Sequence, residues 1–161
     1  MKCYLVLLLL ISLVSAEYHE KCTDEEHEDI RQCIMMFSNS ANIENKTVED
    51  TRQVCMEGRN CFEGIECLDA YRSRQVLKAG CDYEMFLLTK FKTCREIIKA
   101  KSNCLNLDFN STAQHCDMFR SMYQCVIPVI KTQCGSEKLA RKFRQKYLLH
   151  NKLSFQCESL E

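Results

Sequence analysis

Cysteine is the residue type with the widest chemical repertoire in this chain of 161 residues, which carries 13 of them. Structural zinc sites take cysteine ligands two to four residues apart, and thioredoxin-like redox sites use a CxxC motif. No CxxC motif occurs here. We therefore expect no metal or other cofactor, and we predict disulfide bonds for Cys22, Cys33, Cys55, Cys61, Cys67, Cys81, Cys94, Cys104, Cys116, Cys125, Cys134 and Cys157.

Two histidines have neighbours that invite a catalytic or metal-binding interpretation. The triplet His115-Cys116-Asp117 resembles the helix of secreted phospholipases A2, but those enzymes also need a glycine-rich calcium loop, and the chain has four scattered glycines. His27 lies in the acidic run 24–29, which lacks the spacing and the glycine of an EF-hand and has the composition of a helix start. Since no GxSxG, HExxH, P-loop or GxGxxG motif occurs either, we predict that the protein is not an enzyme.

A run of basic residues near the C-terminus is the main candidate for binding. At helical spacing these residues lie opposite an apolar stripe of Leu139, Phe143 and Tyr147, and such a face could bind sulfated glycans or an anionic membrane surface. A solvated helix face with no ligand is the alternative. The candidate residues are Lys138, Arg141, Lys142, Arg144 and Lys146, with Lys152 just beyond.

Two sequons predict modification by glycans. Asn45-Lys46-Thr47 and Asn110-Ser111-Thr112 both lie where helices are expected to begin, and such positions are usually exposed. We therefore predict N-glycosylation at Asn45 or Asn110, or at both.

The first sixteen residues have the features of a cleaved secretory signal. Lys2 precedes an apolar run, and the run is followed by small residues up to Ala16, where signal peptidase would cut. The run, about 12 residues long, is shorter than the roughly 20 that span a bilayer, so we expect no stable membrane anchor. Cleavage after Ala16 would remove Cys3 and leave twelve cysteines. An even number of cysteines fits export to an oxidising compartment, where they would form up to six bridges in a single secreted domain over 17–161. The pairing stays open.

Composition restricts the fold and the partners. The 22 basic and 22 acidic residues balance, which argues against a nucleic-acid partner, because phosphates attract a net excess of Lys and Arg. One proline and four glycines leave little turn chemistry for a β-sandwich. Capping residues and apolar periodicity predict a compact all-α bundle of about five to six helices over about 24–38, 47–58, 65–71, 82–98, 112–134 and 136–150.

The predicted helix 112–134 carries three evenly spaced cysteines. Cys116, Cys125 and Cys134 are nine residues apart, a rise of about 13.5 Å at each step, so they cannot bridge one another. Nine residues also correspond to half a turn, so Cys125 faces away from the other two. We therefore expect this helix to be bonded to neighbours on two sides.

The cysteine pattern resembles a known family. Cys22-Thr23-Asp24-Glu25-Glu26, the run Cys55/Cys61/Cys67, the evenly spaced cysteines ending at Cys134-Gly135, and the terminal Cys157 resemble the nematode-expanded secreted twelve-cysteine family called domain of unknown function nineteen. The resemblance covers about 22–157. It implies a helical, disulfide-bonded and exported scaffold, and it implies no catalytic residue.

Two functions fit these features. The first is a non-catalytic binding or structural module that acts on an extracellular protein or glycan. The alternative is a carrier of small apolar ligands, because the two Cys-x8-Cys intervals resemble an element of insect odorant-binding proteins. Its candidate lining residues are Met35, Met36, Phe37, Phe86, Phe119 and Met122.

Overall fold

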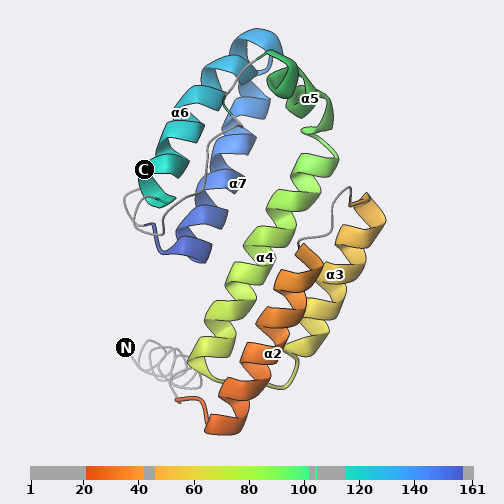
Figure 1. The fold of residues 1–161 in the computed structure, drawn as a ribbon, viewed down its shortest axis with the longest axis vertical. Helices are drawn as coiled ribbons and strands as arrows, with labels where there is room; N and C mark the ends of the chain where they lie inside the picture. Colours follow the sequence, from red (N-terminus) through yellow and green to blue (C-terminus); the bar gives the residue numbers. More distant parts are fainter. Residues whose placement is uncertain (1–20, 42–45, 102–103, 105–114, 158–161) are drawn as a thin grey trace, which may run out of the picture. The chain divides into compact units, whose positions relative to one another are not determined.

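The computed structural model describes residues 21–41, 46–101, 104 and 115–157, and these form six α-helices and no strand (Figure 1). The predicted all-α class is therefore confirmed. The helices are α2 (Asp24–Ala41), α3 (Val48–Cys61), α4 (Leu68–Leu88), α5 (Lys92–Lys101), α6 (His115–Gln133) and α7 (Glu137–Phe155).

Reciprocal capping boxes begin the first two of these helices. At α2 the Glu26 amide donates to Thr23 Oγ1 at 3.2 Å, and the Thr23 amide donates to Glu26 Oε2 at 2.7 Å. Thr47 and Asp50 repeat the arrangement at α3. These hydrogen bonds satisfy amides that have no partner within the helix, and they hold the pKa values of the Glu26 and Asp50 carboxyls below their usual range.

The predicted elements 65–71 and 82–98 are wrong in their boundaries. One helix, α4, runs from Leu68 through Gly80 to Leu88. The cost of one helical glycine is about 1 kcal/mol, and here the flanking Ala79 and Cys81 are both buried. The predicted helix 82–98 is interrupted at 89–91, where α4 ends before α5 begins.

Hydrogen bonds at the end of α4 explain the interruption. The Thr89 hydroxyl donates to the Met85 carbonyl, and the Phe91 amide reaches back five residues to the Phe86 carbonyl at 3.0 Å. The Phe91 ring is thereby turned into the core, where it stacks on Phe86 and Phe143. Tertiary packing of Phe91 therefore overrides the continuous helical periodicity of the sequence.

The chain divides into two compact units, one of residues 1–44 and 54–77 and the other of residues 45–53 and 78–161. In the first unit Ile30, Phe62 and Ile65 are buried. Gly58 lies against Leu77, and a Cβ at Gly58 would come within 3.0 Å of the Leu77 methyl groups. The single domain inferred from the sequence stays a prediction.

The core of the second unit is rich in aromatic rings. Phe143 and Tyr147 of α7 are buried and Leu139 is half-buried, as the predicted apolar stripe requires. The Tyr147 hydroxyl donates to the Phe119 carbonyl of α6 at 3.1 Å. Figure 1 shows α6 and α7 side by side, and this hydrogen bond joins them in the core.

All twelve predicted cysteines are disulfide-bonded. The three cysteines of α6 bond to three different partners, so the expected role of this helix is confirmed. Cys55 and Cys81 are bonded as well. The resolved pairs are Cys22–Cys67, Cys33–Cys61, Cys94–Cys134, Cys104–Cys125 and Cys116–Cys157.

Candidate functional site

Three of the five candidate basic residues share the solvent side of α7. The opposite, buried side of the helix is formed by Ala140, Phe143, Tyr147 and Asn151. Because successive residues of an α-helix are rotated by about 100°, the side chains farthest from this core lie around residues 138, 142 and 145. Lys138 and Arg141 are exposed and Lys142 is half-exposed.

Arg144 and Lys146 lie on the two flanks of α7, so the five residues do not form one continuous face. The Arg144 guanidinium carbon lies 5.8 Å from the centre of the Tyr123 ring of α6, a cation–π geometry. Lys146 Nζ lies 3.9 Å from Asp82 Oδ2 of α4. The neighbours of these two side chains come from other helices, which separates them from the other three.

We define the outer face of α7 by the residues that remain on its solvent side: Lys138, Arg141, Lys142, Gln145, Leu149 and Lys152. Four of them are cations, and none is an acid. The acidic residue of this helix, Glu137, is paired with Lys131 of α6 at 3.1 Å. From Lys138 to Lys152 the four charges extend over about 21 Å of helix.

His150 and Ser154 form a second group on α7 that resembles a nucleophile and its base. Ser154 Oγ lies 3.2 Å from His150 Nδ1, and the His150 ring stacks on Tyr83 at 5.2 Å between centres. A catalytic serine also needs a base oriented by a third group and donors for an oxyanion. The two described side chains that stack on or hydrogen-bond to His150 are Tyr83 and Ser154, and neither is a carboxylate.

The environment of His150 predicts a pH-dependent stability. Burial lowers the pKa of His150 below its ordinary value, so the folded protein holds the ring neutral while the unfolded chain still takes up a proton near pH 6.5. Stability should therefore fall as the pH drops below about 6.5 towards the pKa of the folded state. Melting temperatures of the wild type and of His150→Phe at pH 7 and pH 5 test this, since the variant should lose less stability on acidification. An equal loss in both proteins would rule it out.

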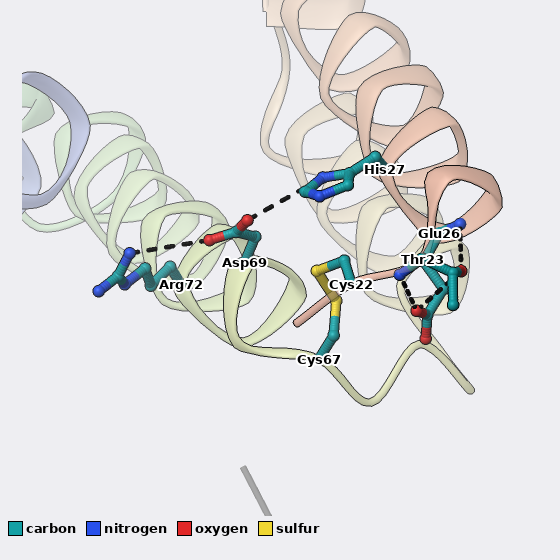
Figure 2. Close-up of a disulfide and its surroundings, with 7 residues drawn as sticks. All are labelled: Cys22, Thr23, Glu26, His27, Cys67, Asp69 and Arg72. Carbon is teal, nitrogen blue, oxygen red and sulfur yellow. Dashed lines mark hydrogen bonds and ion pairs between the residues drawn. A yellow bond between two sulfur atoms is a disulfide. The ribbon is translucent and has the colours of Figure 1, made fainter. Parts of the chain in front are cut away.

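A third group lies beside the Cys22–Cys67 disulfide (Figure 2). His27 Nδ1 and Asp69 Oδ2 are 4.0 Å apart, both side chains are about half exposed, and Cys22 Sγ is close to both. The Cys22 sulfur is already bonded to Cys67 and offers no thiolate, so His27 and Asp69 remain as two donors where a structural zinc ion takes four.

The remaining predictions concern the phospholipase-like triplet, the two sequons and the secretory signal. Cys116 is bonded to Cys157 and Asp117 is paired with Arg120, so two members of the phospholipase-like triplet have structural partners. Asn45 and Asn110, like the predicted signal over 1–16, lie outside the described residues. Among the described residues, no helix is both long and apolar enough to cross a bilayer.

The six residues proposed to line a ligand cavity differ in burial. Phe86 and Phe119 are buried and contact the rings of Phe91 and Tyr147, respectively. Met35 and Met36 are instead exposed, at 55% and 37% of their surface. Sequence reasoning missed this exposed pair. The signal for it was present, because three consecutive apolar residues, 34–36, cannot all face the core from one helix.

The chain matches one family model. Residues 16–158 match the family described as Domain of unknown function (DUF19). No curated protein and no solved structure matches the chain. The family match, like the twelve bonded cysteines, bears out the resemblance seen in the cysteine pattern. Since the match extends over most of its length, the chain belongs to the DUF19 family.

Proposed function

We propose that this protein is a secreted, non-catalytic module that binds linear polyanions, of which sulfated glycans are the model, through the outer face of α7. The observation that carries the proposal is the presence of four cations and no acid on that face. Polyanions bind such surfaces because several charges act together, although each exposed pair alone contributes little.

The composition of the outer face favours a glycan over a membrane. Helices that lie in a bilayer interface bury a broad apolar side in the lipid. On α7 the apolar side is occupied by the protein core, and Leu149 is the large apolar residue on the outer face. A membrane surface would therefore hold the protein through charge alone.

The disulfides support an extracellular location. Bridges of this number persist in oxidising compartments and are rare in the cytosol. The predicted signal over 1–16 would deliver the chain to such a compartment.

Neutralising the outer face should remove most of the affinity for a sulfated polymer. A Lys or Arg beside an anionic surface contributes about 1 kcal/mol, so the double variant Arg141→Gln, Lys142→Gln should bind heparin about 30-fold more weakly at low salt. The matched control is Arg144→Gln, Lys146→Gln, which removes the same charge from the flanks of the same helix. We expect a much smaller loss for the control. Calorimetric titration of the oxidised proteins with heparin gives both dissociation constants.

The salt dependence of heparin binding, and a comparison with anionic vesicles, complete this experiment. Affinity should decrease steeply between about 50 and 200 mM salt if the polymer is held by several charges. Equal weakening by the two double variants, or binding that salt does not change, would contradict the proposal. Tighter binding to anionic vesicles than to heparin would assign the outer face to a membrane instead.

A further inference from the structure

The solvent side of α2 carries the opposite charge to the outer face of α7. The sequence of α2 contains five carboxylates and one guanidinium, and the acidic residues are concentrated in its first two turns. The core side of this helix is formed by Ile30 and Cys33, which are buried. We define the outer face of α2 by its exposed residues at one helical spacing: Glu25, Glu28, Asp29, Gln32 and Met36.

The two outer faces have the same spacing of residue types. On α2 the acids at 25, 28 and 29 are followed by Gln32 and by Met36. On α7 the bases at 138, 141 and 142 are followed by Gln145 and by Leu149. Each set occupies positions i, i+3, i+4, i+7 and i+11, which form one stripe on an α-helix.

From this correspondence we infer that α2 of one molecule docks in parallel against α7 of a second copy of the chain. Aligned in this register, Glu25 faces Lys138. The flanks of the two stripes meet crosswise when parallel helices face one another, so Glu28 faces Lys142 and Asp29 faces Arg141. Gln32 then faces Gln145, and Met36 faces Leu149. Three pairs of opposite charge, one amide pair and one apolar pair therefore meet along about three turns of helix.

Exposure and charge both favour a second copy as the occupant. Met36 is 37% exposed and Leu149 is 49% exposed, so the docking covers apolar surface at the same end of both stripes. The formal net charge of the chain is zero at neutral pH, so copies do not repel one another as a whole. Glu28 also forms an ion pair with Arg31 of the same helix at 2.7 Å. The intermolecular pairs of Glu25 and Asp29 therefore contribute most to the specificity of docking.

The expected complex is weak and sensitive to salt. A single pair of helices buries less surface than a standard stable interface, and exposed ion pairs are screened at high ionic strength. Each molecule carries both faces, so the product is either a closed dimer or an open chain. The inference shares the outer face of α7 with the proposed function, and a sulfated polymer should therefore compete with self-association.

A charge exchange between two variants tests the inference. In sedimentation velocity at low salt, the wild type should sediment faster as its concentration rises. The variants Glu25→Lys, Asp29→Lys and Lys138→Glu, Arg141→Glu should each remain monomeric, because like charges then face one another. An equimolar mixture of the two should associate again, since each variant restores the partner that the other has lost. Far-UV circular dichroism verifies that each variant is folded.

Two matched controls change the same number of charges elsewhere. Glu63→Lys, Glu66→Lys and Lys78→Glu, Lys90→Glu alter exposed residues outside both faces, and both should associate like the wild type. A wild type that stays monomeric at every concentration, or a mixture that fails to associate, would overturn the inference.

Heparin binding separates this inference from the proposed function. The variant Glu25→Lys, Asp29→Lys keeps the outer face of α7 intact and should bind heparin at least as tightly as the wild type while it loses self-association. Heparin binding without self-association in the wild type would refute docking alone. Self-association without heparin binding would refute the polyanion proposal alone.

Discussion

Phe143→Ala is expected to lower the free energy of unfolding by about 3–5 kcal/mol, the usual cost of removing a buried phenylalanine ring. Phe143 is 2% exposed, and its ring stacks on Phe91 at 4.9 Å and on Tyr147 at 5.3 Å between centres. It also meets Tyr83 of α4 edge to face at 6.3 Å. The truncation therefore leaves a cavity and removes three aromatic contacts at once.

Urea denaturation of the oxidised protein, followed by far-UV circular dichroism, measures this loss. Phe155→Ala is the matched control, because Phe155 lies on the same helix but is 45% exposed, with its ring beside Phe119. We expect it to cost about 1 kcal/mol or less. Similar losses in the two variants would show that the ring cluster around Phe143 is not the main core of its unit.

Local signals predicted where the helices begin. Thr23 with Glu26, and Thr47 with Asp50, place a hydroxyl and a carboxylate three residues apart, and both pairs form the reciprocal caps expected of that spacing. The prediction that Cys116, Cys125 and Cys134 do not bridge one another likewise depends on helix geometry alone, and their three separate partners confirm it.

Features that depend on packing were not predictable in the same way. The predicted helices left residues 72–81 between them, yet Ala79 and Cys81 are buried on either side of Gly80 and α4 continues through this segment. Phe91 lies inside the predicted helix 82–98, but its ring packs into the core on Phe143, and the chain turns there. The pairing of cysteines was open for the same reason, since sequence distance does not determine which helices meet.

The outer face of α7 could be predicted from the sequence only in part. Helical rotation alone separates Arg144 and Lys146 from the outer face of α7, but their partners, Tyr123 and Asp82, come from helices whose positions only the fold provides. The complementary stripes on α2 and α7 can be read from the sequence. That both stripes are exposed follows from the burial of Ile30 and Tyr147 on the opposite sides of these helices.

The Cys116–Cys157 bridge is expected to contribute the second large stability effect. Replacing both cysteines by alanine should lower the free energy of unfolding by about 2–4 kcal/mol, because the bridge closes a long loop in the unfolded chain. The two residues are 41 positions apart, and Cys157 is 1% exposed. The bridge also holds the end of α7, where Gln156 turns the chain out of the helix with a φ of 53°.

Cys104→Ala, Cys125→Ala is the matched comparison, since it removes another bridge of α6. Its cysteines are only 21 positions apart, which reduces the chain-entropy contribution by about 0.6 kcal/mol. Cys125 is also exposed, so less apolar contact is lost on the α6 side. Urea denaturation should therefore rank the Cys116–Cys157 variant as the less stable of the two, and amide exchange should rise in the last turn of α7 in that variant alone. The reverse order would show that the C-terminal end of α7 is held by Tyr147 and Asn151 rather than by the disulfide, because those buried residues anchor the same segment.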